Sequence, residues 1–370
     1  MTQAAPRSQS LLRRLIPGLI FGFLVFVALV LLGDLRQVSA KVREFRWELY
    51  PLVLGLTLFN YTLRFGKWHF YLRQIGARGP NGRGPDGRGL SLKESARMFV
   101  GGFPLAVTPG KVGEVLKGAW IRQKTGIPAA RGVAVVVAER ISDGLAVLFL
   151  STVGVVASPR YWPAFAAVLA LLLGIVVVSQ VRPLAEFLLD LGERLPLVKR
   201  FAHALREFYE GSFTLFRPGA TLLAVGLGMV SWLGEGTGMY LILRGLGVPG
   251  GWHTFSTAVF ALSFSIVIGA ASTLPGGLGA SEVSIAGMLV LILHLPADTA
   301  AAATLLIRLA TLWFGVSLGL AVWAVSREML GLGGVSRDAQ DDGKTVRGKK
   351  NQQDAQDEQD ETRSPRGSKI

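Results

Sequence analysis

The residues of this chain that could do chemistry come in two copies, each of which combines a Pro-Gly turn with ionisable side chains in apolar sequence. Arg140 and Arg308 lie 168 residues apart (308 − 140), as do Glu114 and Glu282 (282 − 114). A Pro-Gly break inside a membrane segment frees backbone N–H groups, and glycines let an anion approach them closely. The pattern therefore predicts a phosphate site with arginine and lysine as counter-charges. The two turns read Pro109-Gly110-Lys111-Val112-Gly113-Glu114 and Pro275-Gly276-Gly277-Leu278-Gly279-Ala280-Ser281-Glu282.

Three further acidic residues, Glu139, Asp143 and Glu235, lie in apolar sequence. A charge at membrane depth costs about 2.5–3.5 kcal/mol or more, so each is expected to face a protein interior or a wet cavity. Arg140 and Asp143 are three residues apart and share one helix face, on which they could pair. Two interpretations stay open for these charges: substrate binding, and buried ion pairs that only hold helices together. The duplication favours binding for the two arginines and for the two turns.

The composition is that of a protein with many membrane spans. Half of the 370 residues are hydrophobic, 17% are charged, and the mean hydropathy is +0.43. We expect an all-α polytopic membrane protein with about six to eight transmembrane helices. The chain has no cysteine, and its four histidines lack metal-binding spacing, so we expect no metal and no cofactor. The net charge of +14 fits basic cytoplasmic loops that face anionic lipid, so we expect no nucleic-acid partner.

Apolar runs alternate with polar segments along the chain. Residues 76–93 are rich in glycine, proline and arginine and predict a flexible basic loop, while 182–217 predict an amphipathic segment on the membrane surface. Residues 327–370 are polar, and we expect a disordered tail. A signal peptide cleaved after Val38-Ser39-Ala40 competes with a first retained helix. The runs predict spans at 16–32, 49–65, 133–157, 161–181, 221–243 and 300–325, and short-helix or re-entrant hairpins at 98–127 and 254–293.

Counting the spans from a cytoplasmic N-terminus gives the two copies opposite directions. The span at 133–157 then runs outward and the span at 300–325 runs inward, which is an inverted-topology repeat. We place repeat 1 at about 90–157 and repeat 2 at about 254–326, both within a transmembrane domain at 1–326. The C-terminal tail is expected in the cytoplasm. Basic residues after the first turn are expected to hold its exit in the cytoplasm: Lys117, Arg122, Lys124 and Arg131.

In combination, these motifs resemble one family over about residues 10 to 326. It is the flippase-like transmembrane domain of bacterial lysylphosphatidylglycerol synthases. The resemblance implies movement of an aminoacylated lipid between leaflets of a bacterial or archaeal cell membrane. In the full-length synthases a separate soluble domain makes that lipid, whereas here only a short polar tail follows Val325. We therefore expect no synthase activity from this chain, and a separate lipid-synthesising enzyme is one partner that this interpretation allows.

The favoured hypothesis is a lipid flippase for a phosphate-bearing lipid: a phospholipid, an aminoacylated phospholipid or a polyprenyl-phosphate-linked head group. Membrane lipids are then the main partners, and a homo-oligomer is compatible with the sequence. Glu235 and Glu282 could neutralise a cationic head group or carry a coupling proton. The alternatives are a membrane enzyme with Glu139 and Asp143 as acid and base, and an ion-coupled transporter of small solutes. The predicted binding residues are Pro109, Gly110, Lys111, Glu114, Arg140, Asp143, Glu235, Pro275, Gly276, Gly279, Glu282 and Arg308.

Overall fold

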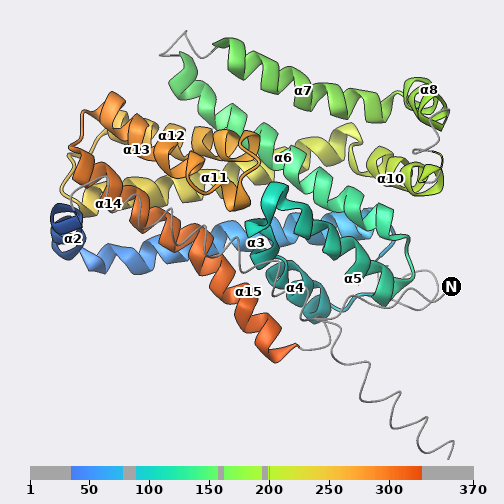
Figure 1. Ribbon diagram of the computed structural model, residues 1–370, viewed down its shortest axis with the longest axis horizontal. Coiled ribbons are helices and arrows are strands. Elements are labelled where there is room, and N and C mark those ends of the chain that lie inside the picture. Colours follow the sequence, from blue (N-terminus) through green and yellow to red (C-terminus); the bar gives the residue numbers. More distant parts are fainter. Residues whose placement is uncertain (1–34, 78–88, 157–161, 194–198, 200, 327–370) are drawn as a thin grey trace, which may run out of the picture. The chain divides into compact units, whose positions relative to one another are not determined.

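The described part of the chain is built from helices joined by short turns (Figure 1). A computed structural model describes residues 35–77, 89–156, 162–193, 199 and 201–326. The α-helices are α2 (Leu35–Glu44), α3 (Tyr50–Gln74), α4 (Leu92–Gly101), α5 (Leu116–Thr125), α6 (Ala129–Val156), α7 (Trp162–Gln180), α8 (Arg182–Glu193), α10 (Ala202–Leu215), α11 (Pro218–Gly245), α12 (Trp252–Ala271), α13 (Ala280–Leu293), α14 (Ala297–Arg308) and α15 (Phe314–Val325). Five short elements join them: η1 (Trp47–Leu49), η2 (Phe103–Val107), η3 (Pro109–Val115), η5 (Pro275–Gly277) and the π-helical η6 (Leu309–Trp313).

The predicted all-α membrane class is confirmed. Three of the described helical segments are long and apolar enough to cross a membrane, namely Trp252–Ala271, Pro275–Leu293 and Ala297–Val325. The number rises to five if each of two sharply bent helix pairs is one span. Helix α6 is as long as these spans but carries Glu139, Arg140 and Asp143 in its middle. The predicted first span at 16–32 and the tail at 327–370 lie outside the described residues.

Two helical hairpins form the centre of the fold, as predicted. The first consists of α4 and α5, with η2 and η3 at its tip, and the second consists of α12 and α13, with η5 at its tip. In Figure 1 the first hairpin comes from the right and the second from the left, and their tips meet between them. Two hairpins that approach each other from opposite sides are the arrangement that an inverted repeat predicts.

Three long helices pack beside the hairpins and place charged side chains against them. Helix α11 packs along α3, α6 and α12, and α5 packs along α6. The contact of α11 with α12 is close because Gly236 has no side chain: a Cβ there would lie 2.8 Å from Val259. Gly228 meets Ala146 of α6 in the same way, also at 2.8 Å. Small residues bring α11 near enough to its neighbours for side chains of four helices to share one interior.

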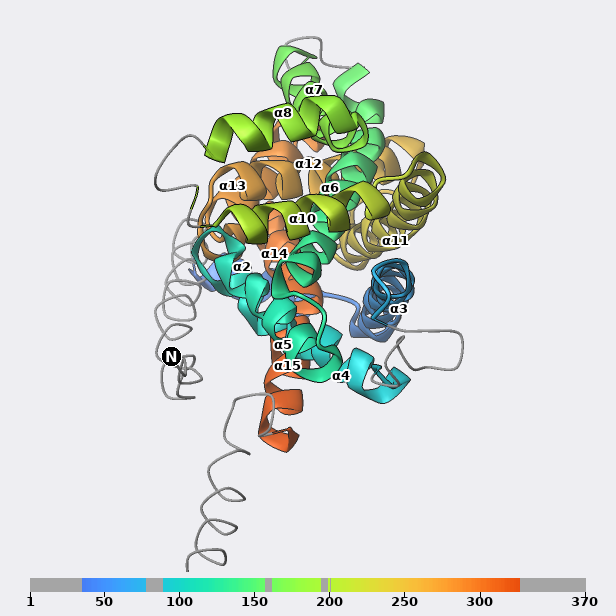
Figure 2. The same cartoon turned by 90° about the vertical axis from the view of Figure 1, so that its right-hand side faces the viewer.

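The segment predicted to be amphipathic, 182–217, contains α8 and α10. Helix α8 bends by 94° away from α7, and α10 bends by 75° away from α11. Large apolar side chains of α8 are exposed, among them Phe187 and Leu191. Helix α10 instead packs against α6 (Figure 2). The bends have the geometry that a surface segment needs, and its position on a membrane stays a prediction.

The structure corrects the predicted end of the second span. The apolar run was expected to end near residue 65, but α3 continues to Gln74 and is a single helix of 25 residues. Lys67 and Trp68, which follow the expected end, are fully buried. Residues 78–88 of the predicted loop at 76–93 lie outside the described part, and α4 already begins at Leu92. A lysine inside apolar sequence marked a buried charge here, not the start of a loop.

Candidate substrate-binding site

The two Pro-Gly turns have the same backbone conformation. Gly110 has φ 58° and ψ 13°, and Gly276 has φ 62° and ψ 11°. The next residue is also left-handed in both turns, with φ 56° at Lys111 and φ 68° at Gly277. Glycine adopts this region freely, whereas a side chain makes it costly. The duplication in the sequence is therefore a duplication of shape, and Lys111 is the member of the four that carries backbone strain.

The tips of the two hairpins touch. The Gly110 N–H donates a hydrogen bond of 2.9 Å to the carbonyl oxygen of Thr273, in the loop that leads into the second turn. Behind the tips, Val107 from the first hairpin, Leu278 from the second and Val316 from α15 form a small buried apolar cluster. The contact joins two segments that are more than 160 residues apart in sequence, so the two predicted turns form one site.

Each hairpin also contributes one half of a duplicated ion pair. In repeat 1, Arg140 Nε lies 3.4 Å from Glu114 Oε2. In repeat 2, Arg308 Nε donates to Glu282 Oε1. Both glutamates are almost fully buried, while the two arginines keep part of their surface open. The spacing of 168 residues therefore preserves a contact, from the second arm of each hairpin to the long helical segment that follows it.

The pair in repeat 2 is tied to its turn more closely than the pair in repeat 1. Arg308 Nη2 donates to the carbonyl oxygen of Gly276 at 3.2 Å. The other oxygen of Glu282 accepts a bond of 2.6 Å from the N–H of Gly279, the residue that precedes α13. The carboxylate thus caps the helix and holds the arginine together. Pro275 opens the same turn, as Pro109 does in repeat 1.

Repeat 1 adds a network of buried charges that repeat 2 does not have in its described residues. Arg64 of α3 donates to Glu139 at 3.0 Å and lies 3.4 Å from Asp143. Lys67 of α3 donates to the other oxygen of Asp143, and Lys117 lies 3.7 Å from Glu139. Arg140 donates to Glu139 at 3.0 Å. The predicted pairing of Arg140 with Asp143 is wrong, because Arg64 and Lys67 take that carboxylate.

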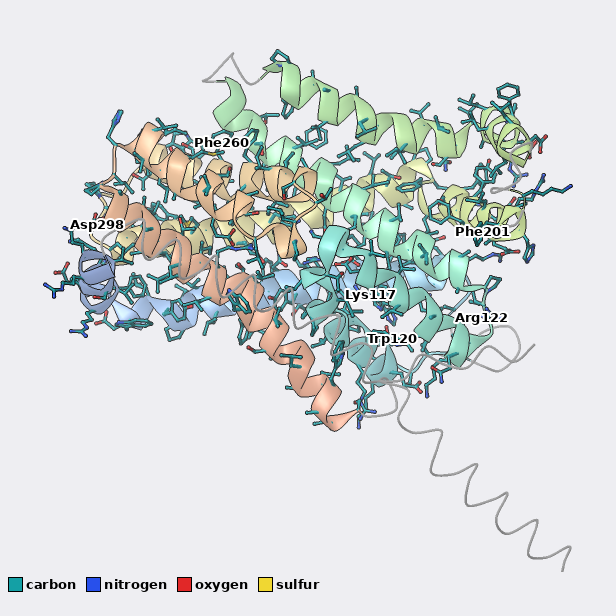
Figure 3. All side chains as sticks on the ribbon, viewed as in Figure 1. Lys117, Trp120, Arg122, Phe201, Phe260 and Asp298 are labelled. Carbon is teal, nitrogen blue, oxygen red and sulfur yellow. The ribbon has the colours of Figure 1, made fainter. Side chains whose placement is uncertain are left out.

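Lys117 also corrects an expectation. The sequence places it among the basic residues of a cytoplasmic exit, yet its side chain is buried to 3% exposure and lies over the rings of Trp68 and Phe99. In Figure 3, Lys117 lies in the interior of the molecule and Arg122 lies at the outer end of the same helix. Sequence reasoning missed Arg64, Lys67 and Lys117 as site residues. The one available signal was that Lys117 stands one helical turn after Glu114.

A cavity of about 150 Å³ opens where the hairpin tips meet α3, α11 and α14. It is lined by residues of both turns and by polar groups of the long helices. Among its described lining residues five are cationic and two are anionic, so the formal charge of its wall is positive. Asp143 and Glu282 contact lining residues without lining the cavity themselves. The charged lining residues are Arg64, Lys111, Glu114, Lys117, Arg140, Glu235 and Arg308.

Two of these charged residues have no ionic partner in the part of the chain that the structure describes. Lys111 lies in the first turn, and Glu235 lies on α11 at 5% exposure. Every other charged lining residue takes part in at least one ion pair. The cavity therefore offers one cation and one carboxylate that protein groups leave unneutralised, beside a set of paired charges that the fold holds in place.

Comparison with known proteins agrees with the motifs. The model of the family described as lysylphosphatidylglycerol synthase TM region matches residues 19–319. A UPF0104 membrane protein of Methanothermobacter thermautotrophicus is 23% identical over 313 residues, which cover 80% of this chain and 88% of that protein. The resemblance read from the motifs is thereby confirmed. The family match includes both hairpins and every residue that lines the cavity.

Proposed function

This chain belongs to the lysylphosphatidylglycerol synthase TM region family, and we propose that it moves a phosphate-bearing lipid between the leaflets of the cell membrane. The head group would bind in the cavity at the hairpin tips, with its phosphate between Lys111, Arg140 and Arg308. Alternating exposure of the cavity past one hairpin and then the other would carry the head group across. The cargo classes are those of the sequence hypothesis: phospholipid, aminoacylated phospholipid or polyprenyl-phosphate-linked head group.

The observation that carries this proposal is the positive cavity formed by two equivalent turns. Arg140 and Arg308 each have one glutamate partner from their own repeat, which fixes the guanidinium and leaves further N–H donors. A phosphate accepts such donors in bidentate geometry, and the surrounding low dielectric strengthens the contact. Two arginines from two repeats, facing one cavity, can pass an anion from one side to the other without a change of chemistry.

Lys111 supports an anionic cargo independently. Its φ of 56° is a conformation that costs a non-glycine residue about 1–2 kcal/mol. The equivalent residue of repeat 2 is glycine, and a Cβ there would lie 2.9 Å from both Gly269 and Ser281. A side chain fits only in the first turn, and the one present is a cation that faces the cavity without an ionic partner. Strain that persists at such a position is evidence of a functional constraint.

The surroundings of Lys111 favour a lipid over a small solute. The next residue, Val112, is 69% exposed, and Val115 of the same element is 46% exposed. Apolar side chains therefore stand on the open side of the turn while the lysine lines the polar cavity. A lipid needs both surfaces at once, since its head group enters the cavity and its chains stay outside it.

The geometry gives the membrane-enzyme alternative less support. Its candidate acid and base, Glu139 and Asp143, are each held by two or more cations, and neither lines the cavity. A general acid or base must reach a proton of the substrate within hydrogen-bond distance. In this structure both carboxylates serve as counter-ions for the side chains of α3.

Transport in proteoliposomes tests the proposal. The purified protein would be reconstituted into phosphatidylcholine vesicles that contain a trace of phosphatidylglycerol labelled on its acyl chain. Accessibility of the label to a membrane-impermeant quencher then reports movement between leaflets. We expect Arg140→Ala and Arg308→Ala to reduce the rate at least about tenfold, the loss of one charged hydrogen bond. Arg122→Ala removes an exposed cation of α5 and is the matched control.

Two additions make this assay decisive. Arg308→Ala leaves Glu282 buried without its partner, so Arg308→Ala combined with Glu282→Ala separates loss of the cation from loss of folding. A panel of lipids with aminoacylated, zwitterionic or polyprenyl-phosphate head groups identifies the cargo class. Wild-type protein that moves none of these lipids, or arginine variants that move them at the wild-type rate, would overturn the proposal.

A further inference from the structure

Glu235 differs from the other buried carboxylates of the described residues in having no cation beside it. Glu139, Glu114 and Asp143 each have a basic nitrogen at 3.0 to 3.4 Å or closer, and Glu282 is bound by Arg308. Glu235 is just as buried, at 5% exposure, yet no hydrogen bond or ion pair to its side chain is found in the described part. Its carboxyl group lines the cavity.

The backbone holds Glu235 in that position. Gly234 packs against Phe59 of α3, where a Cβ would lie 3.2 Å from the ring, and Gly236 packs against Val259 of α12. With close contacts on both sides, α11 cannot rotate to move the carboxyl group out of the cavity. The group is placed by the packing of three helices, and that packing supplies no partner for it.

The groups that face Glu235 from the packed elements are already engaged. Arg64 of α3 is bound to Glu139 and Asp143, and Arg308 at the end of α14 is bound to Glu282. Tyr61 of α3 donates to the carbonyl oxygen of Thr311, and Ser265 of α12 donates to that of Leu262. Asp143 of α6 adds a second negative charge nearby. A bare carboxylate at membrane depth is costly without a partner, and binding a proton removes that cost.

We propose that Glu235 binds a proton together with the anionic head group, so that the protein moves a lipid anion and a proton as one electroneutral load. This inference rests on the proposed function of the cavity. The proton comes from water that reaches the cavity and forms an O–H bond on the Glu235 carboxyl group. On the other side of the membrane the same bond releases it to water.

Electrostatics gives the two ligands a common fate. A phosphate between Arg140, Arg308 and Lys111 places a negative charge in the cavity that the Glu235 carboxylate also lines, and like charges in a low-dielectric site repel strongly. The protonated carboxyl group removes this repulsion and can donate a hydrogen bond to the phosphate. Because coupling is reciprocal, the anion strengthens proton binding as much as the proton strengthens anion binding.

The structure also decides between the two residues that the sequence offered as proton carriers. One oxygen of Glu282 accepts from Arg308, and the other accepts from the Gly279 N–H. A proton on Glu282 would break one of these bonds and expose a buried cation. Glu235 has neither constraint, so it can change its protonation state without dismantling the hairpin.

Binding measurements on the purified full-length protein test the coupling. Titration calorimetry with a short-chain, water-soluble phosphatidylglycerol would be run at about pH 8 and about pH 5, in pairs of buffers with different ionisation enthalpies. We expect at least about fivefold tighter binding at the lower pH, with uptake of up to about one proton per lipid at the higher pH. Glu235→Gln mimics the protonated form, so it should bind tightly at both pH values and take up no proton. Glu210→Gln, an exposed carboxylate of α10, is the control and should behave as wild type.

The outcomes separate this inference from the function on which it rests. Wild-type protein that binds no phosphate-bearing lipid at either pH would overturn the proposed function. Wild-type protein that binds the lipid with equal affinity at both pH values and without proton uptake would overturn the coupling alone. Glu235→Gln with the same pH dependence as wild type would assign the proton to another group and would also overturn it. In vesicles, an inward pH gradient should drive accumulation of the labelled lipid in wild type and leave Glu235→Gln at simple equilibration.

Discussion

The two repeats share a turn and an ion pair but differ in what surrounds them. The 168-residue offset relates Glu139, Asp143 and Lys117 of repeat 1 to Ile307, Thr311 and Ile285 of repeat 2. The arginine of repeat 1 therefore lies in a network with α3, whereas that of repeat 2 lies among apolar and hydroxyl side chains. The features that both halves keep are those that line or support the cavity. The network in one half is extra, and it fixes that half to α3.

The long segments after the hairpins differ as well. Helix α6 runs without a break past Arg140, whereas the segment after Arg308 passes into the π-helical turn Leu309–Trp313 before α15. A π-helical turn inside an α-helical span is rare and occurs mostly at functional sites. We infer that repeat 1 is the fixed half of the protein and that repeat 2, with fewer buried ionic ties and a locally altered helix, is the half that moves.

The largest expected effect comes from breaking the network that only repeat 1 has. Asp143→Ala leaves Lys67 and Arg64 buried without that counter-ion, which should lower the free energy of unfolding by about 3–5 kcal/mol. Thr311→Ala, at the equivalent position, removes only a hydroxyl that bonds to the carbonyl oxygen of Ile307 in its own helix. That loss should be about 1 kcal/mol. Reversible unfolding in detergent measures both, and equal losses would contradict the assignment of repeat 1 as the fixed half.

A second, smaller effect concerns the residue after each turn. Gly277→Ala places a Cβ 2.9 Å from Gly269 and Ser281, so it adds steric overlap to the strain of a left-handed residue. We expect a loss of about 2–4 kcal/mol. Gly247→Ala is the matched control, since its φ is 85° and its Cβ would meet open space. The control should show the backbone strain alone, and a Gly277→Ala loss no larger than that would argue against close packing at the second turn.

The smallest effect distinguishes the two glutamates. Glu282 holds Arg308 and also accepts from the Gly279 N–H, whereas Glu114 is paired with Arg140 alone among the described residues. Glu282→Ala should therefore destabilise the protein more than Glu114→Ala, by about 1 kcal/mol, which is the usual contribution of a helix cap. Unfolding midpoints of the two variants under one set of conditions provide the comparison. The reverse order would show that the cap does not stabilise α13.

Much of the site could be predicted because its symmetry is written in the chain. The turns, the two glutamates and the two arginines recur at a constant spacing, and the structure brings all of them to one place. Arg64 and Lys67 could not be found in this way, because α3 belongs to neither repeat and its contact with Asp143 is tertiary. Lys117 was assigned to a loop because three further cations follow it, and only packing shows that it is buried.

Lys111 provides the most direct test of the central claim, that the cavity binds the phosphate of a lipid. Lys111→Gly places in the first turn the residue that the second turn already has. The account predicts a gain of about 1 kcal/mol in stability, because backbone strain is relieved, together with at least a tenfold loss of phosphatidylglycerol transport. Lys111→Met removes the charge and keeps the strain, so it should lose transport at unchanged stability. Wild-type transport rates in both variants would contradict the account.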